Sequence, residues 1–496
     1  MVRWRPLSSR DEKRLLGGVA IVTACSWARF LATGSLRVDQ NYPPRSIGYV
    51  LLATLVVGWA LAVRGWRGLL ADPPARPRRA AFAALGIAAF MLPMLSNDLF
   101  SVLSYGSAAA AGHDVYATTA SLRDSPFYPF VGERWNQTAC MYGPTTLLAA
   151  LPAGLARGNP WAGLFILRFV WFVPLALTME LSFRRLGDRP FYHAMVWLNP
   201  LWIVVGPGQM HADLLGLVAV TLGIAFHHAG KLRASFAIYA AAVLAKYSFA
   251  PAGLWFWLSG VPPTARRHLA SRLAMMGVVF AAVAVVLYAP FWAGPATITG
   301  PLRDLARMNP GGSITEVLGI VVQFLRTGSV TPPDMAVQAA VDLDRATKES
   351  SWRIVSWITR IVFLVIVARV VPAMVRRPAA GHDPERTLAL GTGVVTVALL
   401  TIAGHRFQSW YLPAALPFFG LACPDVWRRW WTAVVAVAVP VDFACVLERS
   451  SAVYPAWGAV TTGALVVVFV LWFKGRYLRF PDDDGAPPAA RAPAAR

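Results

Sequence analysis

The chain has 496 residues, of which 56% are hydrophobic and only 14% are charged, and its mean hydropathy is +0.51. Soluble domains carry about 25% charged residues, so this composition excludes an ordinary soluble domain and indicates an integral membrane protein. The net charge of +21 does not indicate nucleic-acid binding, because the arginines lie in short loops between apolar runs, where the positive-inside rule places them. The four cysteines show no C-x-x-C pairing, which argues against a disulfide framework or a zinc site.

The apolar runs predict an all-α polytopic membrane protein with about 12–14 transmembrane helices, since a spanning helix needs about 20 apolar residues. The first run follows a basic start and lacks a small-residue cleavage site, so we interpret it as an anchor and not as a signal peptide. The expected spans are roughly 15–36, 47–66, 80–96, 144–156, 161–183, 190–206, 211–229, 233–258, 273–292, 352–372, 387–404, 410–424, 431–449 and 456–474.

Basic loops predict the orientation of these spans. Arginines and lysines precede the first span and fill the loop between the second and third, which places both termini in the cytoplasm. Loops 97–143 and 293–351 then face the periplasm or the exterior of an inner or plasma membrane. Between 144 and 260, two arrangements fit the basic residues. Either 144–156 crosses completely, or it is re-entrant and 233–258 splits at Lys246.

The chain therefore divides into five expected segments. They are N-terminal helices with a cytoplasmic loop (1–79), a transmembrane module that includes loop 97–143 (80–292), a second outer loop (293–351), C-terminal helices (352–476) and a disordered cytoplasmic tail (477–496).

Asp98 stands where the third span ends, in the sequence MLPMLSNDLFSVLS. An aspartate at this place is often a simple helix N-cap. The stretch 99–112 suits a short helix on the membrane surface. The loop behind it is rich in Tyr, Trp and Pro and adds further acids, among them Asp114 and Glu133, so it is able to form a pocket above the bilayer.

Other polar residues interrupt apolar sequence downstream. WLNPLWIVVGPGQMHADLL contains an Asn-Pro step, a Gly-Pro-Gly step, and then His211 and Asp213. Lys246 lies alone in LAKYSFAP, and His405 and Arg406 lie at an outer exit in GHRFQSWYLPAALP. Polar groups and broken helices in a membrane usually line a cavity, although snorkelling also explains an isolated Lys or Arg. Asp442 has no evident partner in the sequence.

The sequence of loop 97–143, with Ser96 and Pro144 at its ends, resembles the signature loop of bacterial polyprenyl-phosphate-mannose-dependent α-1,6-mannosyltransferases. These are membrane glycosyltransferases of the GT-C class. WLNPLW, LAKYSFAP and FQSWYLPAALP are similar to further steps of these enzymes, so the likeness covers roughly residues 80–425. Two positions depart from the pattern, since Met141 replaces a usual proline and Asn97 replaces a second acid. The matching loop steps are Ser96-Asn97-Asp98, Gly112-His113-Asp114-Val115-Tyr116, Asp124-Ser125-Pro126, Trp135-Asn136-Gln137-Thr138 and Tyr142-Gly143-Pro144.

The resemblance implies a GT-C-type fold whose active site lies in an outer-face loop and short helix of module 80–292. It implies that a hexose, which is mannose in that family, passes from a polyprenyl-phosphate sugar to a glycan or glycolipid acceptor with inversion. Inversion needs one general base, for which we choose Asp98. Arg406 suits the leaving phosphate, because a guanidinium matches phosphate oxygens. The further candidates are Lys246 and His405 for the phosphate, and His211, Asp213, Asp114, Glu133 and Tyr142 for the sugar or acceptor.

We expect no cofactor, because one carboxylate beside the amide of Asn97 makes a poor divalent-metal site. The expected partners are the lipid-linked donor, the acceptor and the bilayer. Two alternatives stay open. One is a GT-C enzyme with a glucose or arabinose donor. The other is a lipid or solute transporter, which the long loop 97–143 and the lack of hydropathy symmetry between the halves make less favourable.

Overall fold

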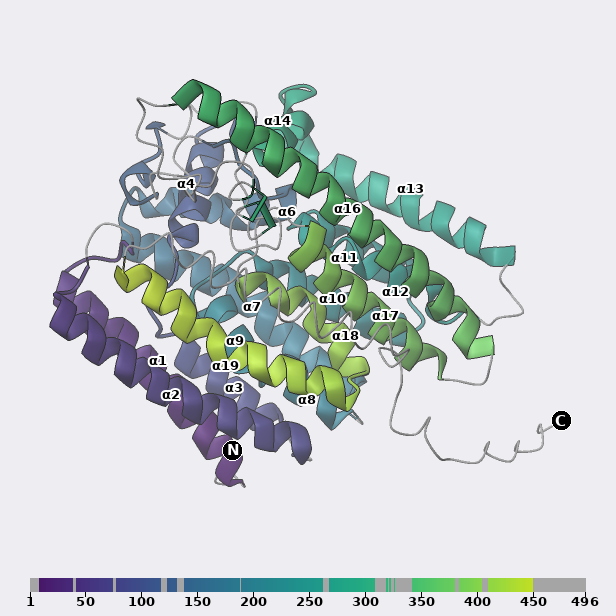
Figure 1. Cartoon of the computed structure of the whole chain (residues 1–496), viewed down its shortest axis with the longest axis horizontal. Coiled ribbons are helices and arrows are strands. Elements are labelled where there is room, and N and C mark those ends of the chain that lie inside the picture. Colours follow the sequence, from purple (N-terminus) through teal and green to yellow (C-terminus); the bar gives the residue numbers. More distant parts are fainter. Residues whose placement is uncertain are drawn as a thin grey trace.

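The computed structural model describes residues 9–38, 42–74, 77–116, 123–131, 138–187, 189–261, 267–307, 318–319, 321–322, 325, 341–379, 383–403 and 409–448. Within these ranges the protein is a bundle of helices without β-strands (Figure 1). Elements marked η are short 3₁₀ or π turns. The elements are α1 (Arg10–Thr33), α2 (Arg45–Ala71), α3 (Arg78–Ala88), α4 (Asp98–Ala110), η1 (Tyr128–Phe130), α6 (Pro144–Ala150), η2 (Leu151–Ala156), α7 (Pro160–Arg185), α8 (Pro190–Val196), α9 (Pro200–Ile203), η3 (Val204–Gly208), α10 (Asp213–His228), α11 (Leu232–Val243), η4 (Tyr247–Phe249), α12 (Ala252–Leu258), α13 (Leu269–Tyr288), η6 (Ala289–Phe291), α14 (Ala296–Arg307), α16 (Val341–Ala379), α17 (Pro384–Ala398), η7 (Leu399–Ala403), η8 (Ser409–Ala415), α18 (Leu416–Leu421) and α19 (Asp425–Glu448).

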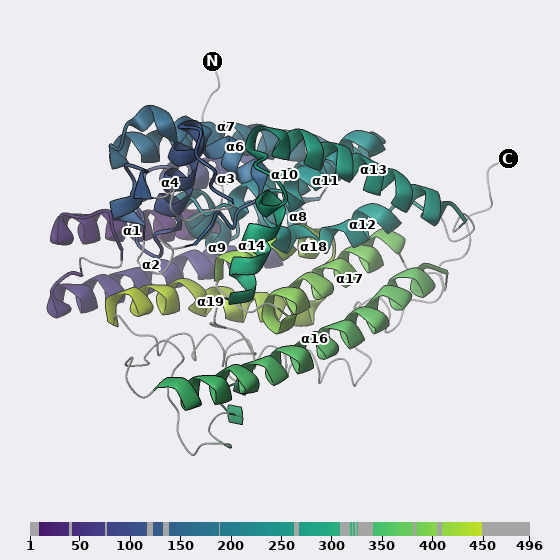
Figure 2. The same cartoon turned by 90° about the horizontal axis from the view of Figure 1, so that it is seen from above.

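The helices confirm the predicted all-α, multi-pass class. In the described ranges, six helices are long and apolar enough to cross a membrane, and α9–η3 with α10 adds a seventh if this pair, bent by 118°, counts as one span. Figure 2 shows α13 and α16 at opposite edges of the bundle. Both helices expose apolar side chains, such as Val285 (70%) on α13 and Leu364 (61%) on α16, as lipid-facing helices do.

The number of unbroken spans is smaller than the predicted 12–14 because several predicted spans are interrupted. The run 80–96 is helical only to Ala88, and 233–258 breaks between α11 and α12. The last predicted span, 456–474, lies outside the described residues. The break in 233–258 falls at Lys246, as the re-entrant alternative required. A straight helix over 144–156 measures only about 20 Å, which is too short for a bilayer core of about 30 Å.

Loop 97–143 and the C-terminal end of α13 lie at the same end of the bundle. Tyr116 in the loop contacts the ring of Tyr288 at the end of α13, with centroids 5.8 Å apart. The connection after α1 reaches the same place, since the backbone N–H of Val38 donates to the side chain of Asn97 over 2.9 Å. The two long loops that the sequence singled out therefore begin on one face of the protein.

Helices α1 and α2 form a close antiparallel pair along one side of the bundle (Figure 1). A β-carbon on Gly18 would lie 2.4 Å from the backbone of both Gly58 and Ala62, so the contact depends on the missing side chain. A β-carbon on the neighbouring Gly17 would meet nothing within 4 Å. Small residues of this kind allow membrane helices to approach closely.

This pair of glycines provides a matched test of the packing. We expect Gly18→Ala to lower the melting temperature in detergent, because the new methyl group forces α1 away from α2. Gly17→Ala should leave the melting temperature unchanged or raise it, since alanine at an exposed helix position makes the helix more stable than glycine does, by up to about 1 kcal/mol. Equal melting temperatures for the two variants would contradict the described contact.

Candidate functional site

Asp98 begins α4, directly after a non-helical segment at residues 91–97 that is almost wholly buried. A buried irregular segment cannot satisfy its own backbone groups, so it needs partners from elsewhere. Gln209 supplies them on one side. Its Oε1 accepts from the backbone N–H groups of Met94 (2.7 Å) and Leu95 (3.0 Å), and its Nε2 donates to the carbonyl of Leu92 (3.1 Å).

Two buried arginines complete the support of this segment. Arg168, from the middle of α7, donates to the carbonyls of Met91 and Gly208. Arg29, near the end of α1, donates to the carbonyl of Pro93 over 3.5 Å. The guanidinium groups thus join α1, α7 and the η3 turn to the backbone that carries Asp98. Neither arginine was selected from the sequence, although Arg168 in the apolar run FILRFVW carried the signal of a charge within a span.

The broken helix at 199–213 positions His211. The Asn199 side chain caps α9 by accepting from the N–H of Leu201 over 3.0 Å, and the chain then forms the η3 π turn. Met210 has a φ of 58°, a conformation that costs a non-glycine residue of order 1 kcal/mol and that turns the chain into α10. Such a strained turn next to a polar side chain is typical of functional sites.

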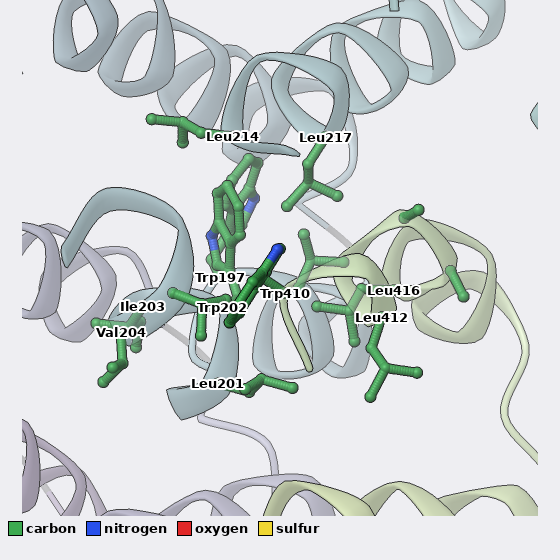
Figure 3. Packing of buried hydrophobic residues seen from close by; sticks show 14 of the residues in the cluster. Trp197, Leu201, Trp202, Ile203, Val204, Leu214, Leu217, Trp410, Leu412 and Leu416 are labelled. Carbon is green, nitrogen blue, oxygen red and sulfur yellow. The ribbon is translucent and has the colours of Figure 1, made fainter. Parts of the chain in front are cut away.

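His211 and Asp98 meet across the site. His211 Nδ1 lies 3.2 Å from Asp98 Oδ2, and the histidine side chain is 1% exposed while that of Asp98 is 19% exposed. The imidazole stacks on Trp410, with ring centroids 4.3 Å apart and an angle of 19° between the planes. Figure 3 shows Trp410 among buried residues that include Trp197, Trp202 and Leu412. The histidine is therefore fixed, and the carboxylate keeps an open side.

A second charged pair lies beside the first. Lys246 Nζ is 2.5 Å from Asp213 Oδ2, and it also lies 4.1 Å from the centre of the Tyr411 ring. Asp213 is 2% exposed and Lys246 is 18% exposed. The sequence suggested Lys246 for the phosphate and Asp213 for the sugar or acceptor. The structure brings both to the site, but there the positive charge of Lys246 compensates the negative charge of the buried Asp213.

The Tyr142-Gly143-Pro144 step connects the signature loop to the break that presents Lys246. The N–H of Gly143 donates to the carbonyl of Ala245 over 3.1 Å, and that of Thr145 donates to Leu244 over 3.1 Å. A β-carbon on Gly143 would lie 1.9 Å from the Leu244 carbonyl oxygen, so only glycine fits. The start of α6 thereby satisfies carbonyl groups that the end of α11 leaves free.

The electrostatics of the loop follow from these contacts. Burial by itself raises the pKa of the Asp98 carboxyl, but His211 and the positive charge of Lys246 outweigh it, and this pKa falls below its ordinary value of 3.8. Burial raises the pKa of Tyr142, and the nearby carboxylate of Asp98 raises it further. Asp98 is thus ionised at neutral pH and Tyr142 is a protonated hydrogen-bond donor close to it.

The other predicted site residues lie away from Asp98 or outside the residues that the structure describes. Asp114 follows the far end of α4, about 20 Å along the helix axis from Asp98, where its carboxylate accepts from the N–H of Tyr116 over 3.0 Å. The structure therefore does not bring Asp114 to Asp98. Glu133, His405 and Arg406 lie outside the described residues. In the described ranges, no three potential ligands gather as a metal site, and a metal-free reaction stays a prediction.

Asp442, which the sequence left without a partner, accepts a hydrogen bond from the Ser409 hydroxyl. Ser409 immediately precedes Trp410, the residue under His211. The carboxylate on α19 therefore anchors the start of η8 and, through it, the floor of the site.

The buried ion pair provides a test that does not depend on activity. We expect Lys246→Met to destabilise the protein by about 3–5 kcal/mol, because it leaves Asp213 buried and unpaired. Adding Asp213→Leu should restore much of the melting temperature. The control is Arg184→Met in the pair Arg184–Glu180, which should cost about 1 kcal/mol or less because Arg184 is 72% exposed and Arg78 also pairs with Glu180. A double variant no more stable than Lys246→Met would show that the pair is not coupled.

Comparison with known proteins gives a consistent result. Residues 16–259 match the family model described as alpha-(1->6)-mannopyranosyltransferase, N-terminal domain. The chain is 26% identical over 412 residues to alpha-(1->6)-mannopyranosyltransferase A of Mycobacterium tuberculosis, covering 79% of this chain and 73% of the relative. It is 22% identical over 440 residues to the enzyme of the same name from Corynebacterium glutamicum, covering 84% and 83%. No solved structure matches the chain. Together these matches support an alpha-1,6-mannosyltransferase of the GT-C type.

Proposed function

We propose that this protein transfers mannose from a polyprenyl-phosphate donor to a glycan or glycolipid acceptor, with inversion and with Asp98 as the general base. The relatives are named as mannosyltransferases, which supports the transferred sugar. The observation that carries the assignment of the base is the contact of Asp98 with His211 at the start of α4. It presents an ionised, partly exposed carboxylate at the start of α4, which we place at the depth of the donor's phosphate.

The chemistry needs a group that accepts one proton. The acceptor hydroxyl attacks the anomeric carbon, the bond from this carbon to the phosphate oxygen breaks, and the hydroxyl proton passes to Asp98. A carboxylate of low pKa suffices, because the hydroxyl becomes strongly acidic only as its oxygen bonds to the anomeric carbon. His211 holds the carboxylate in place throughout.

The leaving lipid phosphate gains negative charge, which fixed cations stabilise. Lys246 is near enough to lower the pKa of Asp98, but its partner Asp213 offsets its charge. Arg406 remains the proposed phosphate ligand. It lies shortly before Ser409 and Trp410, and the latter contacts His211. Tyr142 is proposed to donate a hydrogen bond to a sugar hydroxyl or to the phosphate.

Replacement of the base tests the proposed function directly. We expect Asp98→Asn to lower transfer from polyprenyl-phosphate mannose by about 10²–10⁴-fold while the protein stays folded. The matched control is Asp114→Asn at the other end of α4, which should retain activity. The assay uses purified protein in nanodiscs and compares mannose, glucose and arabinose donors, followed by linkage analysis of the product. Faster transfer of glucose or arabinose, or an active Asp98→Asn variant, would contradict the proposal.

The pH dependence tests the contact with His211. The base works in its ionised form, so activity falls as the pH drops through the pKa of Asp98. Because His211 lowers this pKa and burial raises it, His211→Ala should move the acid limb of kcat/KM to higher pH. Ser96→Ala removes a smaller contribution of the same sign and should cause a smaller shift. An unchanged acid limb in His211→Ala would assign the limb to another group.

The orientation is proposed from the basic loops, with both termini in the cytoplasm and Asp98 on the periplasmic or outer face. Cysteines introduced at Ser96, two residues before Asp98, and at Thr299, in α14 after α13, should react with an impermeant thiol reagent in intact cells. Arg67→Cys on the opposite end should react only after lysis. The reverse pattern would invert the topology and place the site in the cytoplasm.

A further inference from the structure

A groove runs along the outer side of the bundle between α2 and α19, away from the proposed active site. The two helices lie side by side in both views (Figures 1 and 2). One section of the groove has a volume of about 720 Å³, and a second of about 510 Å³ adjoins it, because Val63, Arg67 and Ala436 line both. The groove follows one face of each helix.

The floor of the groove depends on a proline in α19. Pro440 has no N–H, so the carbonyl of Ala436, four residues earlier, lacks its helical partner. The indole N–H of Trp59 on α2 donates to this carbonyl over 3.0 Å and to that of Val435 over 2.8 Å. The contact fixes α19 against α2 deep in the groove, and the walls at this level are apolar, with Val56, Ala60 and Val63.

The groove changes from apolar to strongly basic along its length. Helix α2 runs from Val56 to Arg67 along one face, while α19 runs in the opposite direction from Arg429 to Pro440. Both helices therefore place their arginines at the same end. The five arginines that line the two sections are Arg14, Arg64, Arg67, Arg428 and Arg429.

Two of these five charges are already compensated. Arg14 lies 2.8 Å from Asp11, and Arg428 lies 2.7 Å from Asp425. Arg64, Arg67 and Arg429 are exposed, and no acid in the described ranges pairs with them. Three guanidinium groups thus gather at the mouth of an apolar groove, where each is able to bind phosphate oxygens in a two-pronged way.

The basic end of the groove is the end at which α1 begins. Asp98 and the signature loop lie at the other end, near Arg37 and Val38 after α1. Since α1 has 24 residues, about 36 Å of helix separate the two places. By the positive-inside rule, the basic end lies at the cytoplasmic leaflet, where anionic lipids attract arginines. A donor phosphate bound at Asp98 does not reach this groove.

We propose that the groove binds an anionic phospholipid of the membrane. The phosphate of its headgroup contacts Arg64, Arg67 and Arg429, and one acyl chain lies along the apolar walls formed by Val56, Ala60 and Val63. The proposal does not depend on the transferred sugar, and its test uses lipid binding and not transfer activity.

The experiment measures lipid bound to the purified full-length protein by native mass spectrometry. The probes are phosphatidylglycerol and phosphatidylcholine with the same acyl chains. We expect a preference for phosphatidylglycerol in the wild type. The triple variant Arg64→Ala/Arg67→Ala/Arg429→Ala should bind it about 100-fold more weakly, because each arginine near an anionic headgroup contributes about a factor of five.

The control removes three exposed arginines elsewhere, in the triple variant Arg185→Ala/Arg233→Ala/Arg376→Ala, and should bind as the wild type does. Equal weakening in both triple variants would overturn the proposal, since it would mean that only the total charge matters. Ala60→Trp keeps every arginine and fills the apolar wall, so it should also displace the lipid. If Ala60→Trp instead separates a dimer into monomers and leaves phosphatidylglycerol bound, the groove is an interface between two copies and the proposal is wrong.

Discussion

The buried backbone of residues 91–97 is the constraint on which the site depends. An apolar run enters the bundle as α3 and stops being helical after Ala88, so its amide and carbonyl groups need partners in a place where water does not supply them. Gln209, Arg168 and Arg29 meet this need from three different elements. The same bonds fix the direction in which α4 leaves the segment and therefore the position of Asp98.

Charge compensation explains why the residues around Asp98 are arranged in pairs. At low effective dielectric an unpaired charge is costly, and a paired one is strongly oriented. Asp213 pairs with Lys246, and His211 pairs with Asp98. The Trp410 ring stacks on the His211 imidazole, and the Tyr411 ring lies against the Lys246 ammonium group. Asp442 anchors the start of η8 through Ser409, so a carboxylate on α19 helps to fix where the two rings lie.

The closely packed α1–α2 pair connects the two ends of the bundle, which carry different chemistry. Gly18 and its partners on α2 bring the helices into close contact. At one end of this pair, the segment after α1 binds Asn97 and supports the signature loop. At the other end, arginines of α2 and α19 surround a groove. The proposed sites of sugar transfer and of lipid binding therefore lie at opposite ends of this helix pair.

The sequence by itself determined the helical multi-pass class, and it singled out Asp98, the loop after it and Lys246, because hydropathy, helix breakers and isolated charges are local properties. It left open whether the chain breaks at Lys246. It did not reveal that 91–97 is non-helical, since periodicity does not distinguish an apolar run in a buried helix from one in another buried conformation. Only the tertiary structure decided that His211 pairs with Asp98 while Asp213 pairs with Lys246, and that Asp114 stays at the far end of α4. These partners lie far apart in the chain, and the packing of α4, α10 and α11 selects among acids and bases that the sequence presents as equivalent.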